Sequence, residues 1–161
     1  MSTQPPSRDT RAANPVVDVE GLPNLKHPAP DCIVGGQPTP DQLAGAARAG
    51  VRRVINLRGA SEDAGYDEAA CAAELGLEYH AVPITGPQDL TLEKARELDA
   101  LLTAANGPTT LIHCASGARV GALMALRAGW LQGQATDAAI ASGRRWGLAP
   151  KYEPVVRQLL R

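Results

Sequence analysis

Two residues in the segment LIHCASGARVGAL, which runs from Leu111 to Leu123, are spaced so that they could do chemistry together. Cys114 follows an apolar run, and Arg119 comes five positions later. A thiolate is a nucleophile, and a guanidinium offers a planar fork of N–H donors that matches two oxygens of a tetrahedral oxyanion. The pair therefore predicts a site that binds an anion and attacks it with sulfur.

The residues between Cys114 and Arg119 are suited to forming an anion-binding bowl. In a turn from a strand into a helix, successive backbone N–H groups converge on one point, and the helix start adds partial positive charge there. Gly117 permits a backbone angle that a side chain would resist. The same field stabilises a thiolate at Cys114. The predicted anion-binding residues are Ala115, Ser116, Gly117, Ala118 and Arg119.

A lone cysteine at the end of a strand is commonly a small packing residue. The pattern His-Cys-x-x-Gly-x-Arg around Cys114 favours the reactive interpretation there. Cys32 and Cys71 lack such neighbours and are predicted to be packing residues. An odd number of cysteines without paired spacing excludes a disulfide scaffold and predicts neither a metal site nor any other cofactor.

Strands and helices alternate on both sides of this loop, and they must position it. Strands are expected at 31–36 (an edge strand), 51–57, 77–84 and 109–113, and helices at 40–49, 66–75, 91–105, 118–131, 135–145 and 152–160. This alternation predicts an α/β fold with a central, largely parallel sheet flanked by helices. Functional sites in such folds gather at the carboxyl ends of the strands, where Arg58 and the segment 85–89 join Cys114.

Length and charge limit the remaining possibilities. The chain has 161 residues and a net charge of −1. Its length predicts one domain, over 15–161, and the segment 1–14 before it is expected to be a disordered tail. Near-neutral charge argues against nucleic-acid or anionic-membrane partners. No apolar run reaches membrane-spanning length and no leader pattern is present, so a cytoplasmic location is expected. The oligomeric state stays open.

The loop resembles the signature loop of the cysteine-dependent phosphatases, the superfamily of protein tyrosine and dual-specificity phosphatases. Three further pieces, GGQPT at 35–39, VINLR at 54–58 and YHAVPI at 79–84, resemble the bacterial phosphatase-like domain of the β-lactamase-hydrolase-like family. The resemblance implies a dual-specificity-phosphatase-like fold and hydrolysis of phosphate monoesters on a protein or small molecule. It also implies a phosphocysteine at Cys114, phosphate binding by Arg119 and support of the loop by His113.

The resemblance further implies a general acid on an upstream loop. Asp89 is the best-placed candidate, with Asp63 as the alternative, while Arg58 is positioned to extend the anion field. Glu68 is expected to have no role beyond packing or solvation.

Two departures from the superfamily pattern keep other functions open. Only four residues separate Cys114 from Arg119, where the phosphatase pattern has five. Rhodanese-type sulfurtransferases often have the shorter spacing, so a persulfide on Cys114 is an alternative, and a third is an anion-binding module without turnover. Val120 stands where the superfamily has a hydroxyl residue, which predicts slow hydrolysis of the covalent intermediate.

Overall fold

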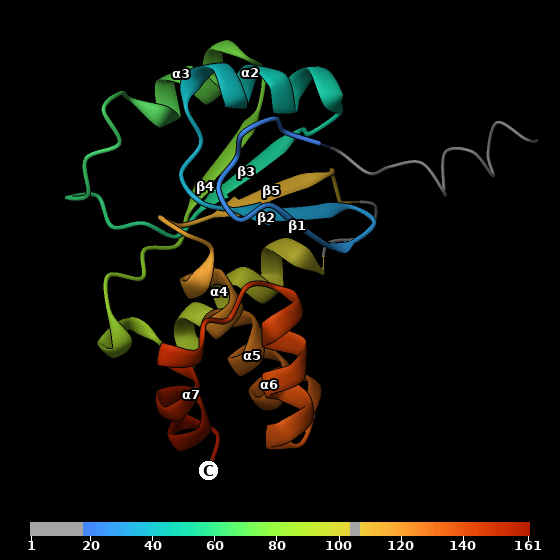
Figure 1. The fold of residues 1–161 in the computed structure, drawn as a ribbon, viewed down its shortest axis with the longest axis vertical. Helices are drawn as coiled ribbons and strands as arrows, with labels where there is room; N and C mark the ends of the chain where they lie inside the picture. The colour runs from blue at the N-terminus through green and yellow to red at the C-terminus, as the bar shows by residue number, and fades with distance from the viewer. Residues whose placement is uncertain (1–17, 104–106) are drawn as a thin grey trace, which may run out of the picture.

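A five-stranded sheet forms the centre of the protein in the computed structural model, which describes residues 18–103 and 107–161 (Figure 1). The strands are β1 (Lys26–Ala29), β2 (Cys32–Gly35), β3 (Arg53–Asn56), β4 (Glu78–Ala81) and β5 (Thr110–His113). Their order is β1-β2-β5-β3-β4, and every neighbouring pair is parallel except β1 with β2. The predicted largely parallel sheet is confirmed.

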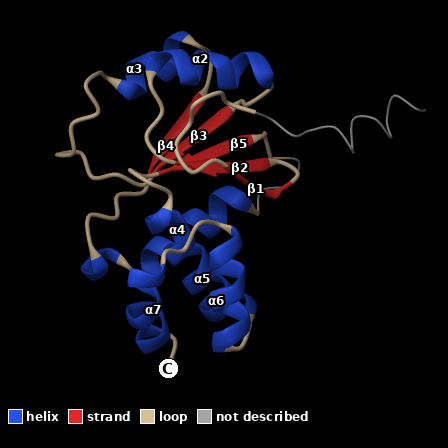
Figure 2. Cartoon of the chain, in the orientation of Figure 1, coloured by secondary structure: helices blue, strands red, loops and turns tan. Residues whose placement is uncertain are grey.

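Helices cover both faces of the sheet (Figure 2). They are α2 (Pro40–Ala49), α3 (Glu68–Glu74), α4 (Leu92–Leu102), α5 (Ala118–Gln132), α6 (Thr136–Arg145) and α7 (Glu153–Leu159), with short 3₁₀ helices η1 (Pro87–Asp89) and η2 (Pro150–Tyr152). Helices α2 and α3 lie on one face and α4 to α7 on the other. Each face buries its own apolar cluster, one around Leu43 and Val54 and the other around Ile112 and Leu123.

Helix α2 shows how local sequence sets the ends of an element. The Thr39 hydroxyl accepts from the Gln42 backbone N–H, and the Gln42 side chain accepts from the Thr39 backbone N–H. This reciprocal capping box, followed by Pro40 at the first turn, starts the helix, and Gly50 ends it in the left-handed region at φ 114°. The predicted bounds of this helix are confirmed.

The sequence-based expectations were wrong about the sheet edge and some element ends. Strand β2 is internal, because β1 pairs with it on the outer side. Strand β1 contains Pro28, a residue that argues against a strand in a sequence but is tolerated in an edge strand. Helix α3 begins at Glu68 because the Asp67 carboxylate caps it by accepting from the Ala70 N–H. The proposed tail at 1–14 lies outside the described residues.

The small residues of the chain bring loops and strands close together. At Gly36, in the segment before α2, a Cβ atom would overlap the Ala115 carbonyl oxygen. The neighbouring Gln37 backbone N–H donates to that same oxygen at 3.2 Å. Glycine at this position therefore lets the segment lie directly against the loop that follows β5. Over the described ranges, no helix is both long and apolar enough to cross a bilayer.

Candidate active site

The loop from Cys114 to Arg119 joins the buried strand β5 to α5, and its carbonyl groups face outward. Besides the bond from Gln37, the Ser116 carbonyl oxygen accepts from the Asn24 side chain at 2.9 Å. In a trans peptide the N–H points away from the C=O of the same unit. The amides of Ser116 and Gly117 are therefore turned toward the inside of the loop. The Gly117 N–H indeed donates to the Cys114 Sγ atom at 2.9 Å.

Gly117 also has the backbone conformation that the loop requires. It caps the N-terminus of α5 at φ 95°, in the left-handed region that side chains resist. The 15 residues of α5 follow directly, so that the positive end of this helix faces the loop. One amide of the loop and the start of a helix thus lie beside the Cys114 sulfur, and the binding of an anion by this loop stays a prediction.

Cys114 is buried at the start of the loop, and the residues that follow it form one wall of a cavity. The cysteine has no exposed surface. A cavity of about 420 Å³ is lined by loop residues together with residues from three other segments: Ser61, Glu62, Thr85, Ala115, Ser116, Ala118, Arg119, Lys151 and Tyr152. Arg119 thus lines the cavity, whereas Cys114, on the same loop, is buried and does not line it.

Arg119 is held so that one edge of its guanidinium is left for a ligand. Nη1 donates to the Glu62 carboxylate at 2.7 Å and to the Ile84 carbonyl oxygen at 2.8 Å, and Nη2 donates to the other Glu62 oxygen at 3.0 Å. A guanidinium has five N–H groups. Within the described ranges, the Nε–H and the second Nη2–H have no partner. These two donors lie on the same edge and match two oxygens of an oxyanion.

Glu62 is a site residue that the sequence analysis missed. Its carboxylate accepts from the Gly59 backbone N–H at 2.8 Å and from Arg58 Nε at 3.2 Å, in addition to Arg119. The hydrogen bonds from Arg119 are the main cause that lowers the pKa of Glu62 to about 2, so this carboxylate is ionised at neutral pH. In return, the hydrogen bonds to Glu62 are the main cause that raises the pKa of Arg119.

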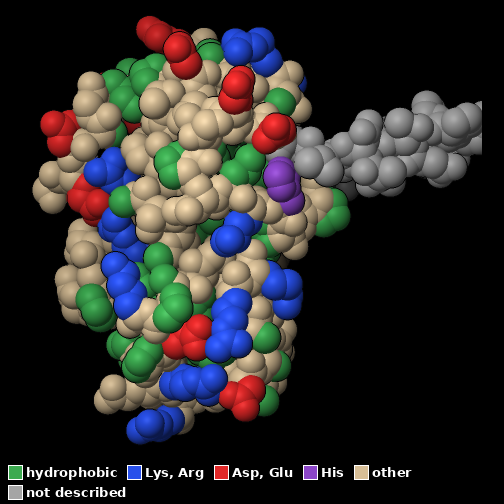
Figure 3. All heavy atoms as spheres, viewed as in Figure 1, with side chains coloured by type: hydrophobic (Ala, Val, Ile, Leu, Met, Phe, Trp, Pro, Cys, Tyr) green, Lys and Arg blue, Asp and Glu red, His purple; other side chains and the backbone are tan. Residues whose placement is uncertain are grey.

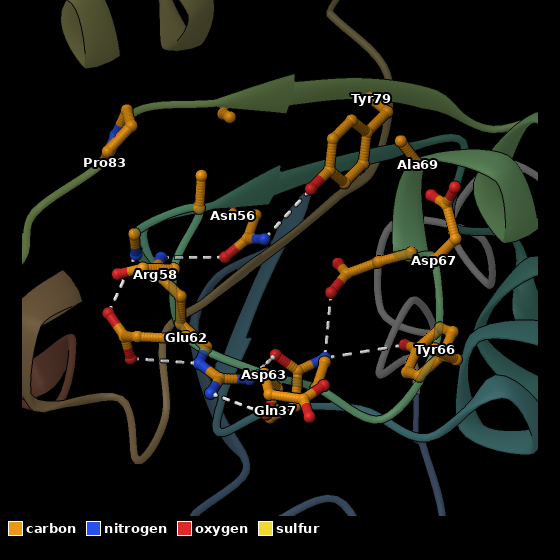
Figure 4. Close-up of a pocket in the computed structure, with 16 residues that line it drawn as sticks. Gln37, Asn56, Arg58, Glu62, Asp63, Tyr66, Asp67, Ala69, Tyr79 and Pro83 are labelled. Atoms are coloured by element: carbon orange, nitrogen blue, oxygen red, sulfur yellow. Dashed lines mark hydrogen bonds and ion pairs between the residues drawn. The ribbon is translucent and has the colours of Figure 1, made fainter.

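Arg58 acts on the bowl through Glu62 and does not line the cavity beside the loop. It lines a second cavity of about 480 Å³, shown in Figure 4, which shares only Ser61 and Glu62 with the first. There Arg58 Nη1 donates to the Gln37 amide oxygen at 2.5 Å, and Nη2 donates to the Asp63 carbonyl oxygen at 3.3 Å. Its expected contribution to the anion field is therefore indirect, since it fixes the carboxylate that fixes Arg119.

His113 lies behind Cys114 and is fully buried. Its Nδ1 atom is 3.2 Å from the Cys114 carbonyl oxygen, which fits the predicted support of the loop. Its Nε2 atom is 2.5 Å from the Glu68 carboxylate, whose other oxygen accepts from the Gln37 side chain at 2.8 Å. The expectation for Glu68 was wrong: only 6% of this residue is exposed, because the first turn of α3 directs it toward the sheet.

The two candidate general acids do not line the cavity beside the loop. Asp89 in η1 accepts from the Thr85 hydroxyl at 2.6 Å and from the Thr85 backbone N–H at 2.9 Å. These hydrogen bonds lower the pKa of Asp89. Thr85 itself lines the cavity, so Asp89 contacts a residue of the cavity wall without lining the cavity. Asp63 lines the second cavity, and its carboxylate accepts from the Gly65 N–H. The acid role of Asp89 stays a prediction.

Lys151 and Tyr152 form the wall contributed by the C-terminal part of the chain. Lys151 Nζ lies 5.5 Å from the centroid of the Tyr152 ring. Over residues 18–103 and 107–161, Lys151 makes no ion pair, so its charge is available at the cavity. On the face viewed in Figure 3, further Lys and Arg side chains lie on the side of the molecule formed by α4 to α7. The described residues contain no group of three or more His, Cys, Asp or Glu arranged to hold a metal ion.

Comparison with known sequences decides the family. Residues 24–135, more than half of the chain, match the phosphatase-like domain of β-lactamase hydrolase-like proteins. The chain belongs to this family. A β-lactamase hydrolase-like protein of Xylella fastidiosa is 36% identical to it over 97 residues, which cover 58% of this chain. The match covers only 22% of that relative, so the chain spans a minor part of its length.

Solved structures share the fold. A DUF442 protein from Shewanella putrefaciens CN-32 is 25% identical, with a TM-score of 0.67 over 88% of this chain and 93% of its own. The core catalytic domain of the PP-IP phosphatase SIW14 from S. cerevisiae is 20% identical, with a TM-score of 0.64 over 89% and 87% of the two chains. The expected dual-specificity-phosphatase-like architecture is confirmed.

Proposed function

We propose that this domain hydrolyses phosphate monoesters, with Cys114 as the nucleophile. The observation that supports the proposal is the way in which the Arg119 guanidinium is held. Glu62 and the Ile84 carbonyl hold its guanidinium so that a two-donor edge remains, on the same loop that directs the Gly117 N–H at the Cys114 sulfur. Membership of a phosphatase-like family supports the same reaction.

In the first step the Cys114 thiolate attacks phosphorus, a P–S bond forms and the ester P–O bond breaks. The leaving oxygen takes a proton from an acid or from water. Loop amides and the Arg119 fork stabilise the charge on the phosphoryl oxygens, where preorganised donors act most strongly. In the second step water attacks phosphorus, and the thiolate leaves.

The proposed acid, Asp89, limits which esters react well. Its lowered pKa means that the carboxylate is largely ionised at neutral pH, so it seldom has a proton to donate. Esters whose leaving group needs no protonation, such as aryl phosphates, are therefore expected to react faster than alkyl phosphates. Val120, buried in the core, has no hydroxyl to assist the second step, which is expected to be slow.

Lys151 supports a finer proposal about the substrate. Within the cavity, the charge of Arg119 is balanced by Glu62, whereas Lys151 has no carboxylate partner in the described part of the chain. We propose that the substrate has a second anionic group close to the phosphate that is transferred. Both a small molecule with two phosphates and a phosphoprotein with a neighbouring acidic residue meet this condition.

The test of the main proposal compares wild-type protein with Cys114→Ser and with Cys71→Ser as a matched control. Hydrolysis of an aryl phosphate is expected for the wild type and for Cys71→Ser, and a loss of at least roughly 10³-fold for Cys114→Ser. A covalent phosphate on the wild-type protein, trapped by rapid acid quench and found by mass spectrometry, is also expected. Activity that survives in Cys114→Ser refutes the proposal.

The short loop and the lowered pKa of Asp89 favour a second candidate function, sulfur transfer. Four residues separate Cys114 from Arg119, and transfer of sulfur needs neither a general acid nor a hydroxyl after the arginine. The Cys114 thiolate would attack the outer sulfur of thiosulfate, forming an S–S bond as the S–S bond of thiosulfate breaks and sulfite leaves. Cyanide would then take the outer sulfur as thiocyanate. Thiocyanate production from thiosulfate and cyanide, without aryl phosphate turnover, selects this candidate.

A further inference from the structure

Gln37, in the segment between β2 and α2, connects three parts of the protein that surround the candidate active site. Its backbone N–H donates to the Ala115 carbonyl oxygen at 3.2 Å, so Gln37 lies against the loop that follows β5. Its side-chain Nε2 donates to the Glu68 carboxylate of α3 at 2.8 Å, and its Oε1 accepts from Arg58 Nη1 at 2.5 Å (Figure 4). Gln37 lines the second cavity and not the cavity that Arg119 lines, so any effect on an anion bound there is indirect.

The partners of the Gln37 amide determine its orientation. The Pro38 carbonyl oxygen, 2.9 Å from Nε2, can only accept a hydrogen bond. The Arg58 guanidinium, 2.5 Å from Oε1, can only donate one. A flipped amide would place two acceptors against each other on one side and two donors against each other on the other side. The amide oxygen therefore faces Arg58, and this assignment does not depend on the protonation of any side chain.

The hydrogen bond to Gln37 is the shortest of those that hold the Arg58 guanidinium. Nε donates to the Glu62 carboxylate at 3.2 Å, and Nη2 donates to the Asp63 carbonyl oxygen at 3.3 Å. An arginine side chain has several rotatable bonds, and fixing them costs conformational entropy that its hydrogen bonds must offset. Without the Gln37 oxygen, two long hydrogen bonds alone would hold the side chain that supports Glu62.

We propose that Gln37 is a positioning residue for the anion site, because its amide oxygen holds Arg58 in the place from which Arg58 supports Glu62. One Glu62 oxygen, Oε1, accepts both from Arg58 Nε at 3.2 Å and from Arg119 Nη2 at 3.0 Å. A displacement of Arg58 therefore displaces an oxygen that orients the Arg119 guanidinium. The proposal rests on the proposed function only in that Arg119 binds the oxyanion.

The test measures the affinity for vanadate by titration calorimetry, so it needs no turnover. Gln37→Met keeps the length of the side chain and removes the amide. Gln42→Met is the matched control, since this glutamine of α2 also makes side-chain hydrogen bonds, with the Thr39 N–H and the Glu20 carbonyl oxygen, and lines neither cavity at the site. Both substitutions are also made in an Arg58→Met background, which removes the partner through which Gln37 is proposed to act.

We expect Gln37→Met to bind vanadate roughly three- to tenfold more weakly than Gln42→Met, which is the effect of one lost hydrogen bond. In the Arg58→Met background, the two substitutions should differ by less than about twofold. A role in folding alone would give the same factor in both backgrounds. Equal affinities of Gln37→Met and Gln42→Met, or an equal loss in the two backgrounds, overturn the inference. If Gln37→Met does not fold, Gln37→Asn replaces it under the same criteria, because the shorter side chain withdraws the amide oxygen from Arg58.

The two proposals fail in different ways. A protein that hydrolyses aryl phosphates through Cys114, yet whose affinity for vanadate is independent of Gln37, refutes the role of Gln37 alone. A loss of vanadate affinity in Gln37→Met that requires Arg58, in a protein without turnover of aryl phosphate, refutes the proposed function alone.

Discussion

Replacing Glu62 by glutamine tests whether this carboxylate orients Arg119 for the substrate. Glu62 accepts four hydrogen bonds, of which two come from Arg119, and the variant loses its charge and turns an N–H₂ group toward one of these donors. A hydrogen bond to a charged group contributes about 1.5–3 kcal/mol. Because 26% of the Glu62 side chain is exposed, solvent reduces this to the lower end, about 1.5 kcal/mol.

That energy corresponds to a loss of roughly tenfold in kcat/KM, and misplacement of the guanidinium extends the expected loss to about 10²-fold. The assay is steady-state hydrolysis of an aryl phosphate together with inhibition by vanadate, which should weaken in parallel. Asp63→Asn is the matched control, since this carboxylate is one residue away and does not contact Arg119. Tighter vanadate binding in Glu62→Gln would refute the reasoning, because it would mean that Glu62 competes with the anion for Arg119.

Four other variants and conditions give further tests. Val120→Thr, nearly isosteric, is expected to raise the steady-state rate while the pre-steady-state burst stays unchanged, with a cost in stability of about 1–3 kcal/mol for the buried hydroxyl. Gly117→Ala, at φ 95°, should destabilise the fold by about 1–2 kcal/mol in urea unfolding. Lys151→Ala should raise KM more than it lowers kcat, and only for substrates with a second anionic group. Because the folded pKa of Glu62 is about 2, against 4.5 for a free side chain, its stabilisation is complete above pH 4.5 and is lost as the pH falls to 2. We expect Glu62 to contribute about 1–2 kcal/mol to the free energy of unfolding, measured as a function of pH, and this contribution should be absent in Glu62→Gln. An equal loss of stability on acidification in that variant contradicts the assignment.

Much of the framework could be predicted from sequence because it depends on local chemistry. The capping residues of α2 set its ends, and the apolar run of β5, Gly117 and the start of α5 shape the loop within ten residues of chain. The alternation of strands and helices along the sequence was sufficient to predict a largely parallel sheet. The roles of Cys114 and Arg119 were proposed on the same local basis; in the structure Arg119 lines a cavity, and Cys114 is buried at the start of the same loop.

The two carboxylates that support the loop could not be predicted in this way. Glu62 reaches Arg119 across 57 positions and Glu68 reaches His113 across 45, and neither has a local pattern that indicates a partner. The order of the strands places Glu62 and Glu68 near the loop. Strand β5 lies beside β3, so the segment that follows β3, which contains both glutamates, lies next to the loop that follows β5. Side-chain periodicity tells which face of an element is buried, but it contains no information about which strand ends are neighbours. The conformation of the loop from Cys114 to Arg119 thus depends on local sequence, whereas the charged residues that hold it in place are decided by the tertiary structure.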